Sequence, residues 1–172
     1  MKKDEIKYER GMSESELYNV EKIYEIKFPL SLKEYLMKSL PISKGFYNWR
    51  DCTDENINYI KKIMNRPFMD LYESIEDIFW SDNWGTIVED EKKVDLIKEK
   101  IKSAPKLIPV FSHRYMPMID EDNPPIISVS DIDVIYYGEN LCDYLDIEFV
   151  NKLQNEIDFE KISYIRFWSD IM

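Results

Sequence analysis

The stretch that decides the fold runs from Leu107 to Gly138 and reads LIPVFSHRYMPMIDEDNPPIISVSDIDVIYYG. Three runs within it are rich in Ile, Val, Phe and Tyr: Leu107 to Phe111, Ile126 to Ser130 and Ile132 to Tyr137. β-Branched and aromatic residues favour strands, and the turn residues Asp120 to Pro124 separate the first run from the other two. The stretch therefore predicts strands of an antiparallel sheet.

The sequence before this stretch has a helical period. Apolar residues at i, i+3 and i+7 predict a helix over Ser13 to Tyr24. A capping box at Ser31 to Glu34 predicts the start of a second helix, which Pro41 ends. A third helix is expected to begin near Thr53 or Asp54 and to stop at Asn65-Arg66-Pro67.

Two further helices are predicted around the strands, at Glu89 to Ser103 and at Leu141 to Leu153. Periodicity does not decide between a strand and a helical turn for Ile162 to Trp168. Helices first and a sheet later predict the α+β class, with helices covering one face of a central, mainly antiparallel sheet. The 172 residues, with four glycines and no repeat, are expected to form a single domain.

The charge of the chain is uneven. Its net value is -11, from 23 basic and 34 acidic residues, and the last third, Tyr115 to Met172, contains 3 of the basic and 13 of the acidic residues. Nucleic acids and anionic membranes are disfavoured as direct partners, because both bind through Lys and Arg. A basic protein partner is favoured. The alternative is that the acidity serves solubility alone.

The start of the chain predicts a cytoplasmic, soluble protein. Met1 to Glu5 is charged and leads into no apolar segment of a signal peptide, and no apolar run approaches the roughly 20 residues of a membrane helix. Cys52 and Cys142 lie far apart and form no CxxC pair, so reduced thiols are expected.

Catalytic and metal motifs are weak. His113 is the only histidine and so the only natural acid or base near neutral pH. A small hydrolase using it would need a nucleophile such as Ser112 and an orienting carboxylate such as Asp133, whereas the simpler interpretation is a hydrogen-bonded residue near the start of a strand. Asp120, Asp122 and Asp131 have EF-hand spacing, but prolines replace the required ligand and glycine. No metal, cofactor or phosphate-binding loop is predicted.

Aromatic residues make up 14% of the chain, and Trp80 and Trp84 lie in its densest aromatic cluster. Four residues apart, the two indoles would lie on one side of a helical turn, where they could form core or a recognition platform.

Several of these segments resemble bacterial members of the SUKH superfamily, the cell-wall-assembly-regulator-like domain. The resemblance lies in FWSDNWG at 79–85, in APKLIPVFSHRYMP at 104–117, in Asn123-Pro124 with Ile127 to Val129, and in DVIYYG at 133–138. FPLSLKEYL at 28–36 is similar to the family's opening, and the likeness covers about residues 14 to 150. The segment LPISKG at 40–45 departs from the Asn-Gly or Gly-rich step of many members.

The resemblance implies an α+β domain that binds proteins without catalysis, in many bacterial members as an immunity protein against a toxin, often a nuclease. Regulatory or scaffold roles in cell-envelope assembly are the alternative it leaves open. Arg114 is expected either to contact a partner or to pair with Asp133 inside the domain. The acidic third and its aromatic neighbours are the predicted partner-binding residues: Trp80, Trp84, His113, Arg114, Tyr115, Asp120, Glu121, Asp122, Asp131, Asp133 and Glu139.

Overall fold

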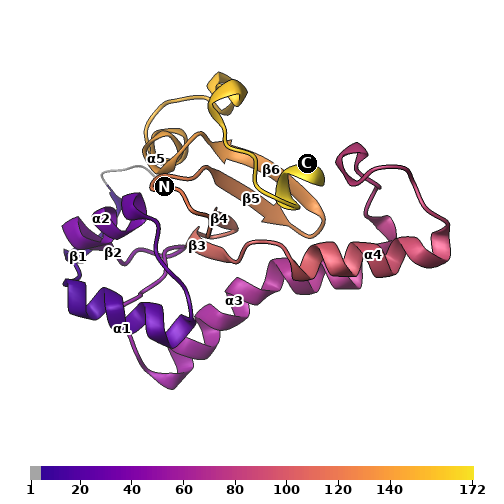
Figure 1. Ribbon diagram of the computed structural model, residues 1–172. Coiled ribbons are helices and arrows are strands. Elements are labelled where there is room, and N and C mark those ends of the chain that lie inside the picture. Colours follow the sequence, from indigo (N-terminus) through magenta and orange to yellow (C-terminus); the bar gives the residue numbers. More distant parts are fainter. Residues whose placement is uncertain (1–4) are drawn as a thin grey trace.

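The computed structural model confirms a single α+β domain and describes residues 5–172 (Figure 1). Residues 1–4, with most of the charged start of the chain, lie outside the described part. Its helices and strands are β1 Tyr8–Arg10, α1 Glu14–Tyr24, α2 Leu30–Lys38, β2 Ser39–Pro41, α3 Asp54–Glu73, η2 Ile75–Asp77, η3 Asp82–Trp84, α4 Asp90–Lys102, β3 Leu107–Phe111, β4 Arg114–Pro117, β5 Ile126–Ser130, β6 Asp133–Gly138, α5 Leu141–Phe149, η4 Gln154–Glu156, η5 Phe159–Lys161 and η6 Trp168–Asp170.

The central sheet is an antiparallel meander in the order β3, β4, β5, β6. Two-residue turns, Ser112-His113 and Asp131-Ile132, join β3 to β4 and β5 to β6. The three predicted strand runs are confirmed. Strand β4 was not predicted, because its sequence RYMP has little β-branched character and ends in proline.

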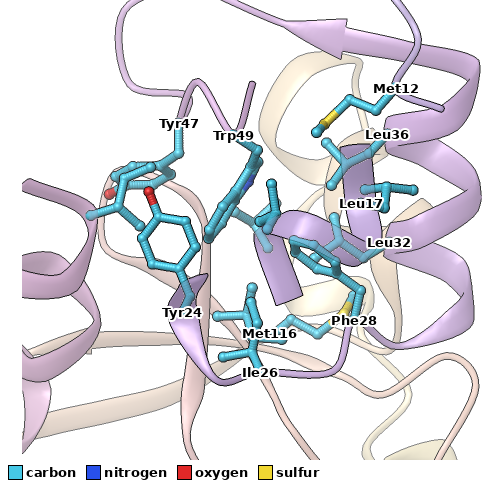
Figure 2. Close-up of a cluster of buried hydrophobic side chains, with 14 of the residues drawn as sticks. Met12, Leu17, Tyr24, Ile26, Phe28, Leu32, Leu36, Tyr47, Trp49 and Met116 are labelled. Carbon is cyan, nitrogen blue, oxygen red and sulfur yellow. The ribbon is translucent and has the colours of Figure 1, made fainter. Parts of the chain in front are cut away.

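Both faces of the sheet are buried, so the expectation of helices on one face only is wrong. Alternate residues of a strand point to opposite faces, and Ile108, Met116 and Ile126 belong to one core whereas Leu107 and Ile127 belong to another. The first core contains residues of α1, α2, α3 and α5, and Figure 2 shows part of it around Trp49. The second core contains residues of α3, α4 and the C-terminal segment, where Ile165, Phe167, Trp168 and Ile171 are buried. Helix α3 lies beside edge strand β3 (Figure 1). Its side chains contribute to both cores.

The ends of the first two helices differ in how well the sequence predicts them. Helix α1 begins at the capping box of Ser13 and Glu16. Helix α2 begins one residue before the predicted box, after Pro29, with no side-chain cap, so the capping box at Ser31 is wrong. The chain leaves helical geometry at Ser39 rather than at Pro41, because Ser39–Pro41 pairs with β1 as strand β2.

Helix α3 continues to Glu73 through Pro67, so the predicted stop at Asn65-Arg66-Pro67 is wrong. Helix α5 ends at Phe149, four residues before the predicted end. The undecided segment Ile162 to Trp168 is no strand and reaches a 3₁₀ turn only at its last residue. Tertiary packing of this segment decides its conformation, since Ile165 and Phe167 are both buried in the second core.

Candidate functional site

The meander separates the predicted partner-binding residues onto opposite ends of the sheet. His113, Asp131 and Asp133 lie at the end where the two short hairpins turn. Asp120 to Asp122 lie at the other end, in the connection from β4 to β5, because consecutive turns of an antiparallel meander alternate between its ends. Glu139 follows β6 at this second end, where the Leu141 amide donates to the neighbouring Asn123 side chain at 3.3 Å. The acidic third therefore forms no single patch.

The hairpin end carries a cavity of about 430 Å³, which we name the hairpin-end cavity. The two hairpin turns form one wall and helix α3 forms the other, with the loop before α3 between them. Its lining residues are Lys44, Gly45, Tyr47, Tyr59, Ile63, Arg66, Pro67, Asp70, Ser112, His113, Tyr115, Val129, Ser130 and Asp131.

Helix α3 supplies residues that the sequence did not single out as a site. Tyr59, Ile63, Arg66 and Asp70 follow one another at helical spacing, so they share one face of α3 and line the cavity together. The Arg66 guanidinium lies 3.5 Å from the Asp70 carboxylate. The Tyr59 ring packs against Tyr47 with centroids 6.2 Å apart. The helical spacing of polar residues along α3 was the signal in the sequence from which this wall could have been predicted.

The hairpin turn Ser112-His113 is fixed by its surroundings. The Ser112 amide donates to the Gly45 carbonyl at 2.8 Å, and the Tyr47 hydroxyl donates to the Ser112 carbonyl at 2.5 Å. The Val129 amide donates to the His113 carbonyl at 3.1 Å. These bonds tie the turn to the loop before α3 and to β5, so one wall of the cavity is rigidly placed.

Three residues with positive φ line this cavity: Gly45 at 102°, Ser112 at 50° and Asp131 at 59°. Residues other than glycine rarely adopt such φ values. Ser112 and Asp131 each occupy the first position of a hairpin turn, where glycine is favoured. Non-glycine residues in this conformation often occur at functional sites. The strain at both turns thus marks the hairpin-end cavity as a candidate binding site.

The catalytic arrangement considered for His113 is not assembled within residues 5–172. Nδ1 of His113 lies 3.3 Å from the Ser112 hydroxyl, but its Nε2 has no hydrogen-bond partner there, and no carboxylate orients the ring. Burial, and secondarily the charge of Arg114, lower the pKa of His113, which favours the neutral imidazole. Exposed Asp133 begins β6 and has no bond to the imidazole. Ser112 and His113 share a turn without the geometry of a nucleophile and its activated base.

The opposite end of the sheet carries a second cavity, of about 640 Å³, which we name the loop-end groove. Its lining includes the apolar residues Phe28, Leu30 and Met118, and Leu30 is 46% exposed. The acidic residues Asp120, Glu121, Asp122 and Glu21 also line the groove, together with Lys27 and Lys33. The Ser31 amide donates to the Asp122 carbonyl at 2.8 Å, which fixes the acidic loop against the start of α2.

Most acidic residues of the last third are exposed and unpaired. The buried or half-buried acids have partners: Glu139 and Asp143 pair with Lys152, Glu148 with Arg114, and Asp158 with Lys161. Within residues 5–172, eight exposed acids of this third form no ion pair: Asp120, Glu121, Asp122, Asp131, Asp133, Asp146, Glu156 and Glu160.

Arg114 is engaged inside the domain, and the expected pairing with Asp133 is wrong. Its Nε lies 3.7 Å from Glu148 Oε2, and its Nη1 donates to the Ser128 hydroxyl at 2.9 Å. The guanidinium carbon lies 3.8 Å from the centre of the Tyr137 ring. Arg114 thus joins three strands to α5 on the first-core face of the sheet.

The two tryptophans of the densest aromatic cluster use both indole N–H groups within the chain. Trp80 donates to the Gly85 carbonyl and Trp84 to the Asp170 carboxylate, each at 2.8 Å. Their rings meet edge to face with centroids 5.5 Å apart, as their spacing suggested, although only Trp84 lies in the 3₁₀ turn. Trp84 also stacks on Phe167. Both indoles are half-buried, and Trp84 holds the loop that contains η3 against the C-terminal segment.

Comparisons with known protein families, with curated protein sequences and with solved structures find no match. The resemblance to SUKH domains stays a prediction. Every helix within residues 5–172 is too short or too polar to span a lipid bilayer. Among the side chains that the structure describes, no three of His, Cys, Asp or Glu are grouped so that they could hold a metal ion.

Proposed function

We propose that this protein binds a basic protein partner without catalysis and neutralises it by covering its surface, as an immunity protein does with its toxin. The supporting observation is the charge at the surface of residues 115–172. Eight exposed carboxylates there have no ion pair, whereas Lys152 and Lys161 are both paired and exposed Arg166 binds a backbone carbonyl. Unpaired charge of one sign steers a partner of the opposite sign and repels others.

The loop-end groove is the proposed interface. Protein interfaces combine an apolar centre with a charged rim, and the groove offers an exposed Leu30 beside the acidic residues 120–122. A nuclease toxin carries a basic surface because it must bind phosphates, so its surface is complementary to this rim. Acidic residues at the hairpin end would then act by long-range attraction rather than by contact.

The test is a pull-down from a lysate that expresses the adjacent open reading frame, eluted stepwise with salt and identified by mass spectrometry. The bait is wild-type protein or the variant Asp120→Asn/Glu121→Gln/Asp122→Asn. The matched control is Glu73→Gln/Glu76→Gln/Asp77→Asn, which removes three exposed carboxylates at the last residue of α3 and in the following η2.

We expect one basic partner that elutes with salt, whose toxicity co-expression relieves. The site variant should release this partner at lower salt and associate more slowly, while the control behaves as wild type. Equal retention by the two variants would remove the groove from the interface. A growth defect on deletion in cells that lack the toxin would favour the alternative of a scaffold in cell-envelope assembly.

A further inference from the structure

We infer that the hairpin-end cavity binds a neutral, polyhydroxylated ligand of the saccharide class. The inference does not depend on the proposed protein partner, whose interface lies at the opposite end of the sheet. The volume of about 430 Å³ is typical of small-molecule sites. The ligand class follows from the charge, the hydrogen-bonding groups and the aromatic wall of the cavity.

The lining is balanced in charge although the chain has a net charge of -11. Lys44 and Arg66 contribute two positive charges, Asp70 and Asp131 contribute two negative charges, and His113 is favoured as the neutral form. An anionic ligand would meet both carboxylates, and a cationic ligand would meet both basic side chains. A neutral ligand avoids either repulsion.

The cavity offers both donors and acceptors that are not in use. Within the described chain, the Tyr59 and Ser130 hydroxyls and the Lys44 ammonium make no hydrogen bond. Arg66 is 68% exposed at its side chain, and Asp131 uses only Oδ1, which accepts from Ser74 at 3.3 Å. A sugar hydroxyl both donates and accepts, so several neighbouring hydroxyls can satisfy such a mixed set.

One aromatic face is available for stacking. Tyr59 is 51% exposed, whereas Tyr47 and Tyr115 behind it are buried. A flat heteroaromatic ligand is held best between two faces, but a pyranose ring presents one apolar C–H face and directs its hydroxyls away from it. A single exposed ring facing polar side chains therefore fits a saccharide better than a nucleobase.

The wall opposite Tyr59 is formed in advance of binding. Strained Ser112 is held by hydrogen bonds with Gly45 and Tyr47, the adjacent His113 by one from Val129, and strained Asp131 by one from Ser74. A rigid wall lowers the cost of ordering the site when a weakly binding neutral ligand enters.

The test follows backbone amide signals of the full chain by NMR during titration with glucose, N-acetylglucosamine and cellobiose. Inorganic phosphate, lysine methyl ester and adenosine are titrated as anionic, cationic and aromatic probes. We expect a saccharide to shift the signals of Gly45, Ser112 and Asp131, with smaller effects from the other probes.

Tyr59→Ala should weaken saccharide binding by roughly threefold to tenfold through loss of the stacked ring. Asp131→Asn keeps a residue that tolerates positive φ but removes the charge, and it should also weaken binding. Tyr18→Ala is the matched control, because Tyr18 is 57% exposed on α1 outside the cavity, and it should bind as wild type. No saccharide shift at the cavity, or larger shifts with phosphate, the lysine ester or adenosine, would overturn the inference.

Discussion

The hydroxyl of Tyr115 donates to the backbone carbonyl of Ile63 at 3.4 Å, across the gap between β4 and α3. Pro67 has no N–H, so the carbonyl four residues before it in the helix lacks its usual donor. That carbonyl belongs to Ile63. Tyr115 therefore replaces the missing helical hydrogen bond and allows α3 to continue through a buried proline.

A double-mutant cycle tests this relationship. Tyr115→Phe should lower the free energy of unfolding by about 1 kcal/mol, because it leaves the Ile63 carbonyl without a hydrogen-bond donor from the protein. In a Pro67→Ala background the helix supplies its own N–H, so the same change should cost clearly less. Urea unfolding of the four proteins measures the coupling. Equal costs of Tyr115→Phe in both backgrounds would show that the hydroxyl has no such role.

Local sequence signals predicted those parts of the fold that local interactions decide. Helix α1 follows the apolar period of Leu17, Val20 and Tyr24, and strands β3, β5 and β6 consist of β-branched and aromatic runs. The predicted helix stop at Pro67 was wrong because the missing hydrogen bond to Ile63 comes from Tyr115. This donor lies 52 residues from Ile63 in the sequence. Spacing along one chain segment contains no information on such a distant partner.

The candidate site, too, could be predicted only as far as local sequence signals reach. The excess of acidic residues in the last third was visible in the sequence, but the separation of His113 from Asp120 to Asp122 depends on the unpredicted strand β4. Had β5 followed β3 directly, His113 and Asp120 to Asp122 would have shared one connection at the same end of the sheet. Tyr115 was grouped with the interface for its type, whereas the structure buries it behind the hairpin-end cavity.

Asp170 links the C-terminal segment to the η3 loop, and its loss should destabilise the protein. Its carboxylate accepts hydrogen bonds from Asn83, Trp84 and Tyr164 at 2.8 to 2.9 Å and from the Phe167 amide at 3.1 Å. Asp170→Asn removes the charge and turns an amide N–H toward these donors. We expect a loss of about 2 kcal/mol in urea unfolding.

Asp82→Asn is the control for this change, since exposed Asp82 lies in η3 and its side chain has no hydrogen bond within residues 5–172. The control should stay within about 0.5 kcal/mol of wild type. A loss of equal size in both variants would point to the loop in general rather than to the Asp170 carboxylate.

Ionisation of the Asp170 carboxylate should make the free energy of unfolding depend on pH. Burial raises the pKa of Asp170, but the hydrogen bonds from Trp84, Asn83, Tyr164 and the Phe167 amide outweigh it and hold the pKa below its ordinary value. Such a group stabilises the fold fully above its unfolded pKa, and this contribution is lost as the pH falls through the folded pKa. The stability difference between wild type and Asp170→Asn should therefore shrink as the pH falls from about 5 to about 2. Urea unfolding at several pH values measures it, and a constant difference would contradict the role of ionisation.

The last prediction concerns the ion pair between Arg114 and Glu148. The side chains are only 12% and 22% exposed, and Arg114 Nε and Glu148 Oε2 are buried without a hydrogen bond within the described residues, as is the nearby Tyr144 hydroxyl. Removing one charge of a buried pair leaves the other without compensation. Arg114→Met should therefore lower the free energy of unfolding by about 3 kcal/mol or more.

A double variant distinguishes the contribution of the Arg114–Glu148 ion pair from that of side-chain packing. Arg114→Met/Glu148→Leu removes both charges, keeps apolar volume and should recover most of the lost stability, because burying two ions costs nearly as much as their attraction returns. Lys98→Met is the matched control on an exposed pair with Asp95 at 3.1 Å and should change stability by less than about 1 kcal/mol. If the double variant were less stable than Arg114→Met alone, contacts of the Glu148 side chain other than the ion pair would be the main contribution, because removal of an uncompensated charge cannot itself destabilise the fold.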